Sequence, residues 1–329
     1  MSKTQHLVIT CPGDVHALVV AKHLQNRNHD LLFLTSEDGF YSDPQFSVLR
    51  LIDEEVGGDS IFDCESVWWR KPTIHFLFKR FETSAECEDN QFKLKEVQTF
   101  FDFVNNKYAE DGKFILGDEH SRGIAKNKLH QLSIAKKLGL RIPKSIISNS
   151  KNNLLDFYDS VDEKCITKSI SSASHSSRGE QVALFTSAVT EVDLLVLKEI
   201  NSYPILLQEK IEKEFELRIT VVGNKLFTAK IDSQHVLDGE LDWRLSDSST
   251  RGHSLFELPA HIQENCLELC RALQLNFGTI DLAVTPENEY VFFEINPNGQ
   301  YLWIEEMLQL PISEAIAELL INPDENRLV

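Results

Sequence analysis

The chain lacks the marks of disulfide-rich, zinc-binding and membrane-spanning proteins. Its six cysteines include no CxxC pair, and no histidine stands at zinc-finger spacing, so we expect reduced and mostly buried thiols. No apolar run approaches the length of a transmembrane helix. The first residues hold one lysine and a short apolar run at 6–9, which predicts a strand and not a signal peptide. We therefore expect a cytoplasmic protein that does not contact membranes.

Basic residues are scarce, and so are the common motifs of catalysis. A net charge of −18 argues against a nucleic-acid partner, which requires a basic stripe, but permits a basic peptide partner. Neither GxxxxGKS/T nor GxGxxG occurs, so a P-loop or Rossmann phosphate site is not supported. No convincing Ser/His/Asp or Cys/His arrangement indicates a nucleophile supplied by the protein.

The patterns that are present predict a mixed α/β protein. The 329 residues, 42% hydrophobic and 26% charged, have room for two or three domains. Apolar strands at 6–10 and 31–35 flank a helix that Asp14 can cap, which predicts a parallel strand–helix–strand unit. Further elements are predicted as follows: strands at 66–69, 165–168, 181–185 and 205–211; helices at 91–108, 126–138, 260–273 and from Pro311; a hairpin of 216–222 and 225–231; and polar loops at 169–179 and 232–254.

An acidic hairpin is the most informative of these patterns. Its apolar segments, 277–283 and 291–296, flank turn-like residues. If the loop is 286–289, Asp281 lies opposite Glu294, and Asn296 shares their face by strand alternation. Two facing carboxylates repel each other, and burying them unpaired is costly. A hard cation such as Mg²⁺ removes both problems; an exposed hairpin face with two solvated acids is the alternative.

Three cationic side chains precede this hairpin. Lys128 stands near a helix start, Lys168 ends a strand beside the serine-rich loop, and Arg218 lies within the earlier hairpin. Each has an ordinary alternative: the lysines would face water, and Arg218 would pair with Glu216 at the surface. Their order ahead of the acidic hairpin favours a nucleoside triphosphate site, because phosphates need cations and a metal held by carboxylates.

In this order the motifs resemble the ATP-grasp superfamily. The residues that carry the resemblance are Lys128, Lys168, Gln208-Glu209-Lys210-Ile211, Arg218, Asp281 and Glu294-Ile295-Asn296. More narrowly, the chain resembles the graspetide, or microviridin-type, peptide ligases. That likeness is carried by Trp69-Arg70-Lys71-Pro72, Glu216-Leu217-Arg218, Asp242-Trp243-Arg244 and Glu294-Ile295-Asn296-Pro297-Asn298-Gly299-Gln300.

The resemblance covers nearly the whole chain and implies a fold. Two α+β subdomains would clasp ATP, preceded by a small α/β pre-ATP-grasp domain with a partly parallel sheet. The implied bounds are 1–117 for the first domain, 118–207 for the central subdomain and 208–329 for the C-terminal subdomain with the metal site.

The resemblance also implies site roles. The residues expected to bind ATP are Lys128 and Lys168 at the phosphates, Gln208, Glu209, Lys210 and Ile211 at adenine, and either Glu209 or Glu216 at ribose. Asp281, Glu294 and Asn296 would hold magnesium, with two ions expected. Arg218 would lie at the γ-phosphate. Arg244 has two open roles, namely charge neutralisation at the reacting centre or a structural bridge to a nearby aspartate.

The implied reaction is ATP-dependent peptide crosslinking. Asp or Glu side chains of a ribosomally made precursor peptide become acyl phosphates, and Ser/Thr hydroxyls or Lys amines attack them to give ω-ester or ω-amide rings. The implied partners are a peptide with a leader and an acidic, hydroxyl-rich core, and a second copy of the chain in a homodimer. Two alternatives stay open: an ATP-grasp ligase that adds an amino acid to a carboxylate, and a nucleotide-binding protein without ligase activity.

Overall fold

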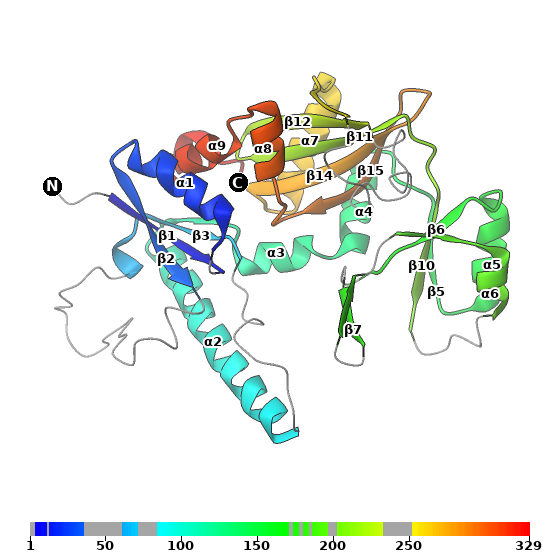
Figure 1. Cartoon of the computed structure of the whole chain (residues 1–329), viewed down its shortest axis with the longest axis horizontal. Helices are drawn as coiled ribbons and strands as arrows, with labels where there is room; N and C mark the ends of the chain where they lie inside the picture. The colour runs from blue at the N-terminus through cyan, green and yellow to red at the C-terminus, as the bar shows by residue number, and fades with distance from the viewer. Residues whose placement is uncertain are drawn as a thin grey trace.

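The structure, a computed structural model, describes residues 4–11, 13–35, 61–71, 84–170, 174–177, 180–183, 186–196, 203–232 and 252–329. Over these residues, three larger sheets spread along the longest axis of the molecule, and helices pack against each of them (Figure 1). This arrangement confirms the predicted α/β class and the parallel sheet of the first region.

The first sheet is parallel, in the order β2-β1-β3-β4. Its strands are β1 (Thr4–Thr10), β2 (His29–Thr35), β3 (Ser66–Trp69) and β4 (Phe114–Leu116). Helix α1 (Val15–Gln25) begins where predicted, because the Asp14 carboxylate accepts from the backbone N–H of His16. One face of the sheet packs on α1, and the other packs on α2 (Ser84–Glu110), while the short 3-10 helix η1 (Ile61–Asp63) precedes β3. Helix α2 extends beyond the predicted 91–108 at both ends.

The second sheet is antiparallel, in the order β5-β10-β6-β9. Its strands are β5 (Ser145–Ser148), β6 (Cys165–Thr167), β9 (Ser187–Val189) and β10 (Ile205–Glu209). Helices α5 (Lys151–Ser160) and α6 (Glu191–Val196) cover it around a core that includes Leu154, Leu194 and Leu207. The predicted domain boundary at 207/208 falls within β10.

The third sheet is antiparallel and has the order β13-β12-β11-β14-β15. Its strands are β11 (Phe215–Val222), β12 (Lys225–Asp232), β13 (Gly252–Leu255), β14 (Phe277–Val284) and β15 (Tyr290–Asn296). The two-residue turn between β11 and β12 is confirmed. Gly223 is required there because its φ is +53° and an added Cβ would lie 1.9 Å from the carbonyl oxygen of Asn326.

Helices complete the third sheet. Helix α3 (Glu119–Ala125) leads into α4 (Lys128–Lys137), which starts after the cap Asn127 and not at 126. Helices α4 and α7 (Ala260–Ala272) share the apolar core of one face. On the other face, α8 (Leu302–Leu308) and α9 (Ile312–Ile321) join this sheet to the first one, and α10 (Pro323–Asn326) follows.

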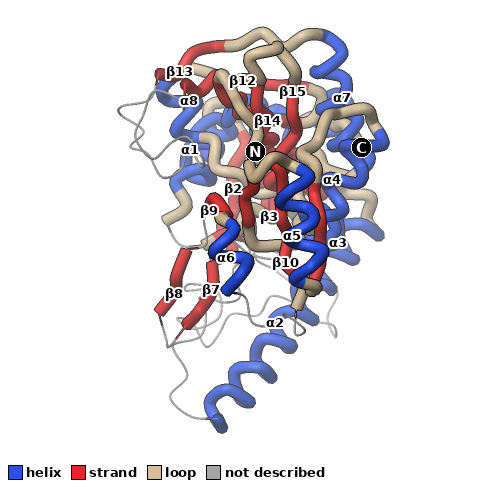
Figure 2. Tube along the Cα trace, turned by 90° about the vertical axis from the view of Figure 1, so that its right-hand side faces the viewer, coloured by secondary structure: helices blue, strands red, loops and turns tan. Residues whose placement is uncertain are grey.

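Two predicted loops contain strands. The serine-rich segment 169–179 includes β7 (Ser174–Ser177), which pairs with β8 (Glu180–Ala183) as a separate hairpin. This hairpin projects from the sheets on the same side as α2 (Figure 2). The end of the predicted loop 232–254 is β13, whereas Asp242, Trp243 and Arg244 lie outside the described residues. No helix within the described part of the chain is long and apolar enough to cross a membrane.

Candidate active site

An ion pair between neighbouring strands lies at the centre of the candidate site. Arg218 on β11 is directly opposite Asp281 on β14. Its Nη1 atom donates to both carboxylate oxygens, at 2.8 and 2.7 Å. The two residues are 6% and 9% exposed, so the pair is largely shielded from water. The prediction that Arg218 could pair with Glu216 at the surface is therefore wrong.

Strand alternation places this pair on the face of the sheet opposite α4 and α7. Leu217 and Ile219, the neighbours of Arg218, belong to the apolar core with α4 and α7. Ile280 and Leu282 flank Asp281 in the same way. The charged pair therefore points to the opposite face of the sheet.

The acidic hairpin has the predicted pairing of Asp281 with Glu294, reached through a bulge. Near the turn, Val284 pairs with Tyr290 and Leu282 with Phe292, one residue out of the predicted register. The register then shifts, and Phe293 is the extra residue on β15. The bulge brings Glu294 opposite Asp281 and compensates for a turn that is one residue shorter than expected.

Glu294 also has a cationic partner. The Nζ atom of Lys128 lies 3.2 Å from its Oε2 atom, and the two side chains are 22% and 21% exposed. The premise that the two carboxylates would be buried without partners is thus wrong, because Arg218 and Lys128 compensate them. The same contacts gather two predicted phosphate ligands and two predicted metal ligands in one place.

Gln131 holds the helix that carries Lys128 against the edge strand. Its Nε2 atom donates to the carbonyl of Ile295 at 2.7 Å, and its Oε1 atom accepts from the N–H of Ile295 at 3.1 Å. It thereby satisfies the outward backbone groups of Ile295 on β15, the edge strand of the sheet among the described residues. The sequence alone did not single out this residue. The signal was a polar side chain on the buried face of α4, three positions after Lys128.

Asn296 ends β15 and begins a turn. Its Oδ1 atom accepts from the N–H of Asn298 at 2.9 Å, and the N–H of Gly299 donates to its carbonyl at 3.2 Å. An amide oxygen has two lone pairs, so this bond leaves Oδ1 able to coordinate a cation.

The predicted adenine hinge connects the second and third sheets. Gln208 is buried and donates to the Ser145 hydroxyl at 2.8 Å, and a Glu209 carboxylate oxygen accepts from the N–H of Lys144 at 3.0 Å. The backbone N–H of Lys210 donates to the carbonyl of Lys164 at 2.8 Å.

Beyond these bonds the hinge reaches the third sheet. Ile211 packs against Ala283 and Val291, and Ala283 shares the face of Asp281. The hinge therefore runs onto the candidate-site face.

Glu216 is on the same face of β11 as Arg218. It forms a buried pair with Lys213, whose Nζ atom lies 2.6 Å from its Oε1 atom. Lys213, which the sequence patterns did not single out, stands three positions before Glu216. Lys168 directly follows β6, the strand that pairs with β10 through Thr167 and Leu207. The predicted residues thus lie on the second sheet, on the third sheet and on the segment between them.

Within the described residues, no group of three or more His, Cys, Asp and Glu side chains could hold a metal ion. A cation at this site would have two carboxylates, one amide oxygen and oxygens from a bound phosphate. That oxygen-only donor set fits Mg²⁺, which keeps several ligands from water and substrate.

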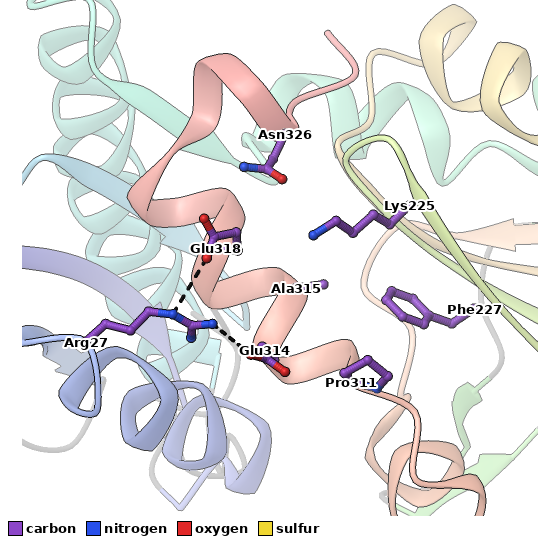
Figure 3. Close-up of a pocket in the computed structure, with 8 residues that line it drawn as sticks. All are labelled: Arg27, Lys225, Phe227, Pro311, Glu314, Ala315, Glu318 and Asn326. Atoms are coloured by element: carbon purple, nitrogen blue, oxygen red, sulfur yellow. Dashed lines mark hydrogen bonds and ion pairs between the residues drawn. The ribbon is translucent and has the colours of Figure 1, made fainter.

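A pocket of about 390 Å³ lies elsewhere, between α1, β12 and α9. Among its lining residues, Arg27 pairs with Glu314 at 2.8 Å and with Glu318 at 3.6 Å. Dashed lines mark these two contacts in Figure 3. None of the predicted site residues lines this pocket, so it is separate from the candidate site.

Comparisons with known proteins agree with the fold described above. The model of the RimK-like ATP-grasp domain matches residues 125–320. The alpha-aminoadipate–LysW ligase LysX of Sulfurisphaera tokodaii is 24% identical over 210 residues, covering 62% of this chain and 68% of that protein.

Two solved structures are similar over nearly the full length. One is the macrocyclase MdnC bound with precursor peptide MdnA from Microcystis aeruginosa, with 29% identity, a TM-score of 0.80, and coverage of 97% of this chain and 99% of that one. The other is a RiPP-associated ATP-grasp ligase from Chryseobacterium gregarium in complex with ADP and a leader and core peptide. It has 26% identity, a TM-score of 0.78 and coverage of 97% of each chain.

Proposed function

The chain belongs to the RimK-like ATP-grasp family, and from this premise we propose that it closes rings in a ribosomally made precursor peptide. It is an ADP-forming ligase with the ATP-grasp fold. In the proposed reaction, Asp or Glu side chains of the peptide are joined to Ser or Thr hydroxyls or to Lys amines. The products are ω-ester or ω-amide macrocycles.

One observation carries the proposal: the likeness to a peptide macrocyclase extends over the whole chain. The family model begins at residue 125, whereas the likeness to MdnC covers 97% of the chain at 29% identity. It therefore includes the parallel sheet of the first region, which the RimK-like domain model does not match. Likeness to a macrocyclase outside the nucleotide-binding part favours a shared substrate class.

The charges of the candidate site suit ATP and a divalent cation. Arg218 and Lys128 are the proposed ligands of the phosphates, together with Lys168. Asp281, Glu294 and Asn296 are the proposed ligands of Mg²⁺, with two ions expected from the resemblance. When Mg-ATP binds, the phosphates would become the partners of the cationic side chains, and Mg²⁺ would become the partner of the carboxylates. Each protein charge would therefore still have a neighbour of opposite sign.

The position of the hinge beside the candidate site suits binding of the adenine base and the ribose. Gln208, Glu209, Lys210 and Ile211 are the proposed adenine-binding residues. Of the two acids considered for ribose, we favour Glu216. It shares the strand face of Arg218, whereas the Glu209 carboxylate bonds to the backbone of Lys144 at the edge of β5.

The chemistry needs no nucleophile from the protein. A peptide carboxylate oxygen attacks the γ-phosphorus of ATP, the bond to ADP breaks, and an acyl phosphate results. A hydroxyl or amine then attacks the acyl carbon, inorganic phosphate leaves with the former carboxylate oxygen, and the proton of the nucleophile is released. Bound Mg²⁺ would neutralise charge on the phosphates.

The chain's own residues act by position and charge. Arg218 would stabilise charge on the γ-phosphate, while the buried face would exclude water from the acyl phosphate. Arg244, outside the described residues, is proposed to neutralise charge at the reacting centre.

Incubation with ATP, Mg²⁺ and a precursor peptide that has a leader and an acidic, hydroxyl-rich core tests the proposal. Mass spectrometry should detect the loss of one water per ring, and one ADP should form for each water lost. The unchanged mass of the peptide, with ADP formed at the same rate in its absence, would overturn the proposal. The Arg218→Met variant is the negative control, because loss of the proposed γ-phosphate ligand should prevent ring formation.

A second candidate rests on the likeness to LysX, a ligase whose name describes joining α-aminoadipate to the protein LysW. In that case the chain adds an amino acid to a carboxylate of a protein or small molecule. The same spectra separate the two candidates, because addition increases the substrate mass by one amino-acid residue. The domain bounds 1–117, 118–207 and 208–329 and a homodimer remain parts of the proposal.

A further inference from the structure

Two motifs that lie far apart in the sequence meet in one buried contact. Arg70, at the end of β3, points its guanidinium at the turn that follows β15. Its Nη1 atom donates to the Asn298 side-chain oxygen at 2.6 Å and to the carbonyls of Asn298 and Gly299 at 3.3 and 3.4 Å. Its Nη2 atom donates to the Gln300 side-chain oxygen at 3.4 Å. The first region thus binds the turn directly.

The first region holds Arg70 in a defined place. Its Nε atom lies 3.5 Å from a carboxylate oxygen of Asp14, the residue that caps α1, and Thr10 donates to that same oxygen at 2.7 Å. The guanidinium carbon lies 6.0 Å from the ring centre of Trp68 and 5.9 Å from that of Tyr301. Arg70 is 1% exposed, so its donors have no access to bulk water and depend on these partners.

The turn that Arg70 holds begins at a proposed metal ligand. Asn296 bonds to the N–H groups of Asn298 and Gly299, as described above. Arg218 reaches the other end, since its Nη2 atom donates to the carbonyl of Gln300 at 3.4 Å. Gly299 lies against β14 so closely that an added Cβ would be 1.7 Å from the Thr279 hydroxyl oxygen. The turn is therefore held between an arginine of the first region and an arginine of the candidate site.

We propose that Arg70 is a positioning residue for the metal–nucleotide site, a role that rests on the proposed function. By fixing the 296–300 turn, it sets where the Asn296 side chain lies and which direction the Arg218 guanidinium takes. Residues that hydrogen-bond to metal ligands and so fix their orientation contribute to metal affinity. Their loss typically lowers metal affinity about 10- to 100-fold. The first region accordingly contributes to the affinity for the metal–nucleotide complex besides any role in folding.

The test compares three variants of the full chain with the wild type. Arg70→Lys keeps the charge near Asp14 but loses the forked contacts with the turn. Asn298→Ala removes the shortest of those contacts from the side of the turn. Arg122→Met is the control, because Arg122 is equally buried at 3% exposure and donates to the Trp69 carbonyl, but it has no contact with the turn among its described bonds.

Calorimetric binding of a non-hydrolysable ATP analogue is measured over a range of Mg²⁺ concentrations, and thermal unfolding of each variant is measured in parallel. We expect Arg70→Lys and Asn298→Ala to need about tenfold more Mg²⁺ or higher for half-maximal binding. Arg122→Met should lower the melting temperature and leave the Mg²⁺ requirement unchanged. A purely structural role of Arg70 predicts the same pattern for Arg70→Lys as for the control.

Three results bear on the proposal. An unchanged Mg²⁺ requirement in both Arg70→Lys and Asn298→Ala overturns the positioning role while leaving the proposed function intact. An equal shift in Arg122→Met overturns it as well, because the effect then follows loss of any buried arginine. Failure of the wild type to bind the analogue in the presence of Mg²⁺ overturns the proposed function, and the role of Arg70 with it.

Discussion

Arg218 on β11 and Asp281 on β14 face each other across the third sheet, and one guanidinium nitrogen contacts both carboxylate oxygens at 2.8 and 2.7 Å. A second pair of the same kind, Lys128 with Glu294, lies beside it. In each pair the cation is a proposed phosphate ligand and the anion a proposed metal ligand. The site is thus charge-balanced by its own residues, and both signs are available to a nucleotide and its cation.

The buried pair predicts a stability effect that can be separated from activity. Arg218→Met leaves the Asp281 carboxylate without its arginine, and we expect a loss of about 3–5 kcal/mol in the free energy of unfolding. The double variant Arg218→Met/Asp281→Leu should recover most of that stability, because an apolar pair replaces the ion pair. Urea denaturation measures both values.

The double variant should recover stability without recovering ring-forming activity. If the pair acts on ATP, the double variant stays at least about 100-fold below the wild type in ring formation. A stable double variant with normal turnover would remove Arg218 and Asp281 from the site.

Glu294→Gln tests the metal role without much change in stability. The Lys128–Glu294 pair is about a fifth exposed, so its loss should cost no more than about 1 kcal/mol. The Mg²⁺ concentration for half-maximal activity should rise about tenfold or more, because one charged ligand is lost. Glu314→Gln, which breaks the ion pair with Arg27 in the separate pocket, is the control and should leave that concentration as it is.

Gln131 predicts a coupling between α4 and the edge of the third sheet. Gln131→Met leaves the N–H and carbonyl of Ile295 without their buried partners, at a cost of about 1–3 kcal/mol. Hydrogen exchange at the Ile295 amide should become faster, and the apparent affinity for ATP should fall as Lys128 moves. Exchange at Ile295 as slow as in the wild type would show that the amide has no such role. His130→Ala, on the exposed side of the same helix, controls for helix stability.

The close approach of Gly299 to β14 predicts a steric conflict. Gly299→Ala places a methyl group 1.7 Å from the Thr279 hydroxyl oxygen and 2.5 Å from its Cγ2 atom. We expect a lower melting temperature and a loss of about 1–3 kcal/mol, as for other overpacked sites. Adding Thr279→Ala should restore part of the loss, since it removes those two atoms. The absence of any rescue would place the conflict elsewhere.

Two buried histidines predict how stability depends on pH. Burial lowers the pKa of His6, with His29 nearby, and that of His16, with Arg70 nearby, from 6.5 to about 4 in each case. The folded chain therefore binds fewer protons than the unfolded chain between these values. Stability should be complete above pH 6.5 and fall progressively as the pH drops toward 4. Melting temperatures across this range should fall less steeply for His16→Phe, which keeps the ring contact with Tyr301; an equal slope would assign the effect to other groups.

Relative positions of residues could be predicted from the sequence where a local pattern within one hairpin or one turn determines them. Opposite placement of Asp281 and Glu294 follows from alternation and turn length, and the bulge at Phe293 preserved that placement although the turn differed from the prediction. The cap at Asp14 and the turn at Gly223 follow from local chemistry in the same way.

Contacts between distant segments could not be predicted. Nothing local to Arg70 indicates that it meets Asn298, because that contact depends on how the first sheet packs on α9 and the third sheet. The pairing of Lys128 with Glu294 likewise depends on Gln131 holding α4 to β15. The cationic partners of Asp281 and Glu294 lie on β11 and α4, outside the acidic hairpin. The hairpin sequence therefore showed two carboxylates without partners, and a metal was expected to compensate them.

The most direct measurement follows the carboxylate oxygen of the peptide. The precursor peptide is prepared with heavy oxygen in its Asp and Glu side chains and incubated with the wild-type chain, ATP and Mg²⁺. Activation as an acyl phosphate predicts that one heavy oxygen appears in inorganic phosphate for each ring formed, because the attacking oxygen leaves with phosphorus. Rings that form while the released phosphate contains no heavy oxygen would contradict carboxylate activation by this site.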